Sequence, residues 1–144
     1  MFKKILVPTD GSELSAKAID GAVDMARRLG AKIVGVTVIE PYSYATLSEY
    51  RPEPFEDYEA RMMKTARERL DKLETAARAA NVEVETLVAR SFSPYEAIID
   101  TATKAGCDAI FMASHGRRGL GAVLLGSETQ KVLTHSKIPV MVYR

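Results

Sequence analysis

Residues 3–12 read Lys-Lys-Ile-Leu-Val-Pro-Thr-Asp-Gly-Ser (KKILVPTDGS), and this stretch contains the unit from which the fold is built. Its apolar run Ile5-Leu6-Val7 is short and continuous, which is typical of a strand covered on both faces. The proline, aspartate and glycine that follow are turn residues. Apolar residues then recur at helical spacing. The stretch therefore predicts a buried strand, a turn and a helix that Ser12 or Ser15 caps and Gly30 ends.

The same alternation of strand and helix continues to the end of the chain. Further strands are predicted at 33–39, 82–88, 109–112 and 138–142, and further helices at 56–80, 94–105 and 127–135. Such alternation gives a parallel sheet with helices on both faces. Because residues 82–88 are half polar, we expect the third strand at an edge, which favours the order 3-2-1-4-5. The predicted class is α/β: a three-layer open sheet of five parallel strands in one domain, residues 1–144.

This strand order predicts where a ligand would bind. The winding reverses between the first and fourth strands, and ligands of such sheets bind beyond the carboxyl ends of the strands at the reversal. Those ends are Pro8-Thr9-Asp10 and Ala113-Ser114-His115-Gly116. Asp10 is therefore a candidate ligand contact. The alternative is that Asp10 only caps its turn, where aspartate is common.

The composition excludes several classes of protein. The 144 residues carry 20 basic and 19 acidic side chains, and a net charge of +1 argues against a general nucleic-acid or membrane-surface binder. No apolar run approaches the roughly 18 residues of a membrane span. The start has too short an apolar stretch for a signal peptide. The single cysteine, Cys107, reads as a buried structural thiol and fits a reducing compartment, so we expect a cytoplasmic protein.

Residues 112–127, MASHGRRGLGAVLLGS, form a glycine-rich stretch after the fourth predicted strand. Glycines let backbone N–H groups approach a phosphate, and a helix start adds a favourable partial charge. A P-loop is excluded because Ala122-Val123 stand where lysine and serine or threonine are needed. The dinucleotide fingerprint fails because its third glycine would be Leu124. What remains is Ala-x-x-Gly-x₉-Gly-Ser, running Ala113, Gly116, Gly126, Ser127.

With this motif the chain resembles the universal stress protein family, which is known for G-x-x-G-x₉-G-[S/T] at this place. The resemblance extends over the whole chain and includes KKILVPTDGS, VIEP, SHGRRGL, LLGSETQKVL and PVMVYR. It implies an adenine nucleotide alpha hydrolase-like, Rossmann-like fold that binds ATP or AMP and acts as a nucleotide-dependent stress-response regulator. It also implies a homodimer through the last strand, Pro139 to Tyr143.

The resemblance also implies residue roles. Asp10 would face the adenosine, the backbone at Val38 would reach the adenine, and the glycine-rich loop would wrap the ribose and phosphates. Any Mg²⁺ or Mn²⁺ would be held by the phosphates, not by side chains. The candidate binding residues are Pro8, Thr9, Asp10, Val38, Met112, Ala113, Ser114, His115, Gly116, Arg117, Gly119, Gly126, Ser127, Glu128 and Thr129.

Two residues depart from the family pattern. Ala113 replaces the first glycine, which costs little if its φ stays below zero. Phe92 stands where family members often have glycine, two positions before Pro94, and would either line the pocket or narrow it.

Capping boxes are predicted at the starts of the helices at 94–105 and 127–135. One joins Ser93 to Glu96, and the other joins Ser127 to Gln130.

Two other functions remain as alternatives to a nucleotide-binding regulator. One is a nucleotide-free dimeric interaction module that recruits partners through the tyrosine-rich segment 40–56. The other is an enzyme that hydrolyses ATP, which we expect to be slow at most because no general base or metal-binding carboxylate pair stands out. The chain has no G-x-S-x-G elbow for a hydrolase triad. His115 and His135 are isolated, so no side-chain metal site is expected.

Overall fold

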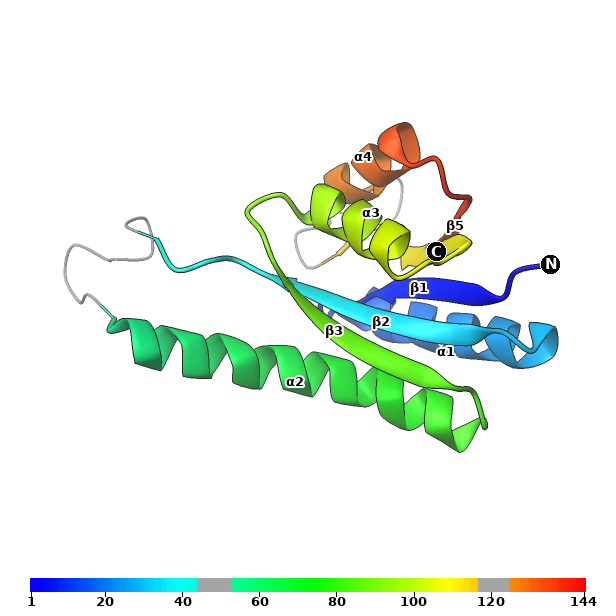
Figure 1. Cartoon of the computed structure of the whole chain (residues 1–144), viewed down its shortest axis with the longest axis horizontal. Coiled ribbons are helices and arrows are strands. Elements are labelled where there is room, and N and C mark those ends of the chain that lie inside the picture. The colour runs from blue at the N-terminus through cyan, green and yellow to red at the C-terminus, as the bar shows by residue number, and fades with distance from the viewer. Residues whose placement is uncertain (44–52, 117–124) are drawn as a thin grey trace.

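The computed structural model describes residues 1–43, 53–116 and 125–144. In chain order it contains β1 (Lys4–Pro8), α1 (Glu13–Leu29), β2 (Lys32–Ile39), α2 (Phe55–Ala79), β3 (Val84–Arg90), α3 (Pro94–Lys104), β4 (Ala109–Ala113), α4 (Ser127–His135) and β5 (Val140–Tyr143). The strands form one parallel sheet in the order β3-β2-β1-β4-β5 (Figure 1). The predicted fold class and strand order are confirmed.

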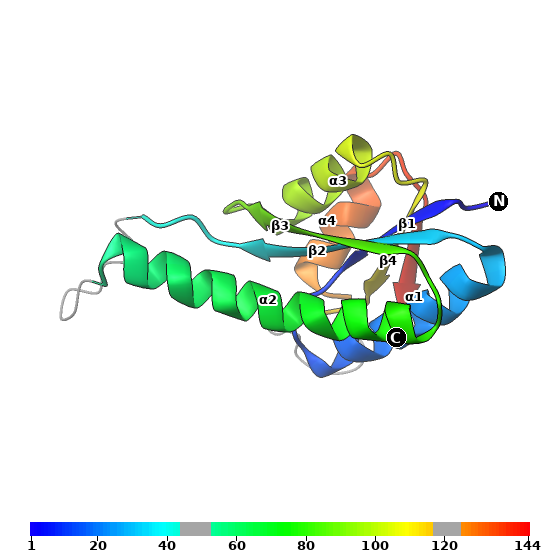
Figure 2. The same cartoon turned by 60° about the horizontal axis from the view of Figure 1, so that its bottom comes forward.

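The helices cover the two faces of the sheet in pairs (Figure 2). One core packs α1 and α2 against the sheet and includes Ile5, Ile33 and Phe111. The other packs α3 and α4 against the opposite face and includes Leu6, Val34 and Ile110. Neighbouring strand residues alternate between the cores because side chains on a strand point to opposite faces. Both faces are covered, which is why the central strands read as continuous apolar runs.

Helix α1 has the predicted ends. Ser12 is its N-cap, and the Ser12 hydroxyl accepts a hydrogen bond from Ser15 N at 3.1 Å. Gly30 ends the helix in the left-handed conformation with φ +64°. Of the two serines that the sequence offered as caps, Ser12 therefore fills the role. Ser15 is buried, and its hydroxyl lies 2.8 Å from that of Thr9.

The predicted capping box of α3 is wrong. Ser93 occupies the N-cap position, but within the described structure its side chain makes no capping hydrogen bond. Ser91 Oγ instead accepts from Ser93 N at 3.0 Å. The N–H of Tyr95, in the first turn, donates to Glu128 Oε2 at 2.8 Å. A charged acceptor from a neighbouring helix thus replaces the local cap, because ionised acceptors make the stronger hydrogen bonds.

The capping box predicted at Ser127 is also wrong, because α4 begins one residue earlier than that box requires. Gly126 is the N-cap, and its carbonyl accepts from Gln130 N at 3.0 Å. Ser127 is already the first helical residue. The Gln130 side chain donates to Leu125 O at 2.8 Å instead of closing a box with Ser127.

The two outer strands start later than predicted. The third strand begins at Val84, although Val82 is buried in the core. The last begins at Val140, because Pro139 has no N–H to give to the sheet. Pro139 contributes its carbonyl, which accepts from Ile110 N at 2.9 Å. Both strands lie at edges of the sheet.

Candidate functional site

The ends of β1 and β4 meet at Asp10 and Gly116. Asp10 Oδ1 accepts a hydrogen bond from Ser12 N at 3.0 Å, which fixes the turn after β1. The other carboxylate oxygen, Oδ2, lies in the space that a side chain on Gly116 would fill. The two residues predicted to face each other across the reversal are therefore in direct contact. Asp10 therefore caps its turn, and a ligand contact of its second oxygen stays a prediction.

The start of α4 is tied to the end of β4 by two hydrogen bonds. Gly126 N donates to Ser114 O at 2.8 Å, and Thr129 Oγ1 donates to Ala113 O at 3.0 Å. A Cβ on Gly126 would lie 3.0 Å from His115 Cα, so the two segments pack backbone to backbone. The first N–H groups of a helix have no partner within the helix. The structure therefore presents the N-terminus of α4 next to the strand end that carries Gly116.

The remaining predicted residues on β1, β2 and β4 contribute backbone more than side chain at this edge. Pro8 is the last residue of β1. Thr9 is 5% exposed, and its hydroxyl lies against that of Ser15 of α1. The side chain therefore joins the turn after β1 to the first helix. Val38 is half-buried in β2 and packs against the α3–α4 core. Met112 is buried in the same core, which leaves its backbone at the edge.

The Glu128 side chain points toward α3. Its carboxylate accepts from Tyr95 N at 2.8 Å and pairs with Lys131 at 3.3 Å. The structure therefore brings Asp10, Gly116, Gly126 and the first turn of α4 together and directs the Glu128 side chain elsewhere. The predicted contacts Arg117 and Gly119 lie outside the described residues.

The structure shows how the chain accommodates Ala113 and Phe92, the two departures from the family pattern. Ala113 ends strand β4, and Asn81 is the one described non-glycine residue with a positive φ. Alanine at position 113 is therefore free of backbone strain. The Phe92 side chain is 62% exposed, so it is not folded into the core. Its turn is held by the hydrogen bond from Ser91 N to Ile39 O at 3.0 Å, which places Phe92 beyond the carboxyl end of β2.

One polar side chain near this edge, Arg69 of α2, was not predicted from the sequence. Its Nη1 donates to Thr37 Oγ1 at 3.3 Å, and Thr37 is 1% exposed near the end of β2. Its side-chain stem passes within 3.2 Å of the Cβ position of Gly11. Arg69 precedes the buried Leu70 on a helix with many charged residues, and nothing in the local sequence separates it from them.

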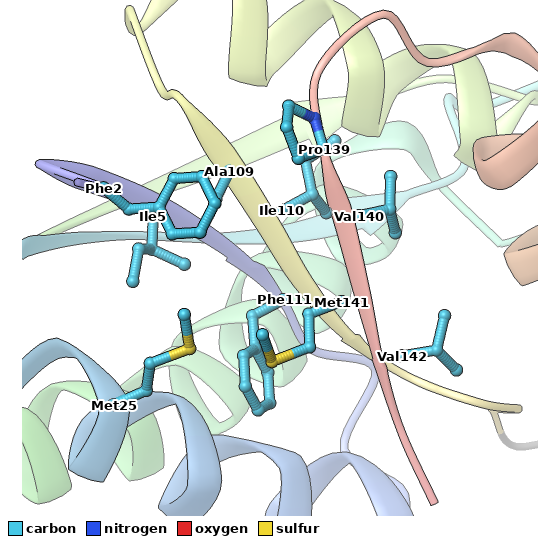
Figure 3. A pocket seen from close by; sticks show the side chains of 10 residues that line it. All are labelled: Phe2, Ile5, Met25, Ala109, Ile110, Phe111, Pro139, Val140, Met141 and Val142. Atoms are coloured by element: carbon cyan, nitrogen blue, oxygen red, sulfur yellow. The ribbon is translucent and has the colours of Figure 1, made fainter.

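A cavity of about 310 Å³ lies elsewhere, beside the edge strand β5. It is lined by Phe2, Pro139 and residues of α1, β1, β4 and β5, and Figure 3 shows Met25, Phe111 and Met141 converging on it. None of the predicted binding residues lines it.

The described part of the chain contains no group of three or more histidine, cysteine, aspartate or glutamate side chains that could hold a metal ion. Cys107 is buried, and burial raises the pKa of its thiol to about 11, which makes it an unreactive structural residue.

Comparison with known proteins points to one family. The model described as Universal stress protein family matches residues 1–144. The universal stress protein YxiE of Bacillus subtilis is 36% identical over 151 residues, with 100% of each chain covered. The solved structure of MJ0577 from Methanocaldococcus jannaschii has a TM-score of 0.83 at 26% identity and covers 99% of this chain and 96% of its own.

Solved relatives include complexes with cAMP and with dAMP. The universal stress protein from Archaeoglobus fulgidus in complex with dAMP has a TM-score of 0.70 at 21% identity, covering 99% of this chain and 98% of its own. This likeness shows the shared fold. In the described residues no helix is both long and apolar enough to cross a bilayer.

Proposed function

The chain belongs to the universal stress protein family, and from this premise we propose that it binds ATP or AMP at the carboxyl ends of β1 and β4. The observation that carries the proposal is the contact between Asp10 and Gly116 beside the start of α4. It joins a carboxylate, a glycine and a helix N-terminus at the reversal of the sheet. The complex of the Archaeoglobus fulgidus relative with dAMP supports an adenine nucleotide as the ligand class.

The charges at this edge orient the ligand. A carboxylate accepts hydrogen bonds from ribose hydroxyls but repels phosphate oxygens, so the adenosine lies at Asp10. The N-terminus of α4 favours negative charge and offers N–H donors, so the phosphates lie at Gly126, Ser127 and Thr129. Mg²⁺ or Mn²⁺ that arrives with ATP is held by the phosphate oxygens. The output is nucleotide-dependent regulation of a stress response in the cytoplasm, with at most slow hydrolysis.

We also propose that two copies pair through β5. This strand ends the sheet on one side, so one row of its N–H and C=O groups faces outward. Met141 is 43% exposed on it, next to the apolar cavity of Figure 3. Antiparallel pairing of two β5 strands satisfies the outward row and covers the apolar surface.

The position of the adenine can be tested with a fluorescent reporter at Phe92. The chain has no tryptophan, so Phe92→Trp creates a single one at an exposed position beyond the end of β2. Because bases stack on aromatic rings, titration with ATP or AMP is expected to quench and shift its emission in a saturable way. Ribose 5-phosphate, which lacks the base, is expected to leave the emission unchanged.

The matched control is Phe2→Trp, at the opposite end of β1. Its emission is expected to stay constant in the same titration. If Phe92→Trp binds ATP by calorimetry and its emission does not change, the adenine lies away from the end of β2. If both reporters respond alike, the change comes from the whole protein and not from the base.

A further inference from the structure

Arg69 and Gly11 form a contact that links helix α2 to the turn after β1. Gly11 has φ +81°, and a Cβ added to it would lie 3.2 Å from Arg69 Cγ and 3.5 Å from Arg69 Nε. The stem of the arginine therefore runs across the face of the glycine. A side chain at position 11 would be disfavoured by the positive φ and would also crowd the arginine.

The head of the same arginine reaches strand β2. Arg69 is half-buried, and its Nη1 donates to Thr37 Oγ1 at 3.3 Å. Thr37 is 1% exposed and directly precedes Val38. One side chain of α2 thus bridges the turn after β1 and the carboxyl end of β2. These are two of the segments from which the proposed site is built.

The bridge bears on Asp10 through its turn. Asp10 Oδ1 is held by Ser12 N, and Gly11 lies between these two residues. Movement of Gly11 would therefore move the carboxylate, whose second oxygen contacts Gly116. The arginine packs against the turn on the face of the sheet that α2 covers. The phosphates are proposed at α4, which packs on the opposite face.

We infer that Arg69 is a positioning residue for the proposed nucleotide site: it holds the Asp10–Gly11–Ser12 turn against the end of β2 and so fixes Asp10 for the ribose. The inference rests on the proposed function. It assigns Arg69 no contact with phosphate. Removing the guanidinium is therefore expected to lower the affinities for adenosine and for ATP by the same factor. A direct contact with phosphate would lower the affinity for ATP alone.

The test compares Arg69→Met with Thr37→Val and with the double variant. Methionine keeps an apolar stem over Gly11 and removes the guanidinium, and valine keeps the shape of threonine and removes the acceptor. Calorimetry is expected to show affinity for adenosine and for ATP reduced about tenfold by Arg69→Met, the effect of losing one hydrogen bond to a charged group. Thr37→Val is expected to give a smaller loss of affinity. The double variant is expected to lose no more affinity than Arg69→Met alone, because both substitutions remove the same Arg69–Thr37 hydrogen bond.

The matched control is Arg67→Met, an exposed arginine on the same helix, which is expected to bind both ligands as the wild type does. A loss for ATP without a loss for adenosine would overturn the inference, because it would place Arg69 on a phosphate. An equal loss in Arg67→Met, or additive losses in the double variant, would also overturn it.

Amide hydrogen exchange of the ligand-free protein separates this inference from the proposed function. Arg69→Met is expected to speed exchange at Ser12, whose N–H is held by Asp10, with global protection unchanged. If the wild type binds no adenine nucleotide, the proposed function fails, and exchange at Ser12 still decides whether Arg69 holds the turn. Unchanged exchange at Ser12 would contradict the inference.

Discussion

Replacing Gly116 by alanine is expected to weaken ATP and AMP binding by about a hundredfold, the upper end of what the loss of a hydrogen bond to a charged group costs. The new methyl group would occupy the position of Asp10 Oδ2, so the carboxylate must leave the place in which it meets the ribose. Gly116 is not among the described glycines with positive φ, so alanine fits its backbone and the fold is expected to survive. Calorimetry with ATP, together with thermal unfolding, checks both parts.

The matched control is Gly30→Ala. Gly30 has φ +64° with open space around its Cβ position, so alanine there strains the backbone at the end of α1 without touching the site. It is expected to lower the free energy of unfolding by about 1 kcal/mol and to leave ATP affinity unchanged. Wild-type affinity in Gly116→Ala would show that the Asp10–Gly116 contact has no part in binding.

The second large effect is expected from Gly126→Val combined with Ser127→Ala. A Cβ at position 126 would lie 3.0 Å from His115 Cα and 3.1 Å from His115 Cβ, and the two methyl groups of valine add to this crowding. The start of α4 must then separate from Ser114, and the donors that the phosphates require move with it. We expect no measurable binding of ATP by calorimetry, with the circular dichroism spectrum of the wild type.

Ser127→Ala alone is the control for that variant. Ser127 is exposed and is the first residue of α4, so its backbone N–H remains in place when the hydroxyl is removed. Its loss of affinity is expected to be several-fold at most, which is the net value of one hydrogen bond. Binding of ATP by the double variant at wild-type affinity would place the phosphates elsewhere.

The fold could be predicted from the sequence because its signals are local. The runs at Ile5–Val7 and 109–112 are apolar throughout since both faces of β1 and β4 are covered. The polar alternation of 82–88 reports an edge, and Pro139 does the same at the other side. These features place the third and fifth strands at the two edges and favour the observed order, which determines which strand ends meet.

The details of the site depend on tertiary contacts that the sequence does not display. Ser127 and Gln130 have the spacing of a capping box, but the hydrogen bond from Gly126 N to Ser114 O starts α4 one residue earlier. Glu128 adjoins the motif, yet the rotation of α4 sends its carboxylate to Tyr95. Arg69 lies 32 residues from Thr37, and only the packing of α2 on β2 brings the two side chains together.

The most direct measurement of the central claim is calorimetry of the purified wild-type protein with ATP, AMP and GTP, after extraction and identification of any nucleotide that co-purifies. We predict saturable binding of ATP or AMP with sub-millimolar affinity, weaker binding of GTP, and an adenine nucleotide in the extract. A folded protein with no extracted adenine nucleotide and no sub-millimolar binding of ATP or AMP would contradict the account. Intact dimers in that preparation would favour a nucleotide-free interaction module.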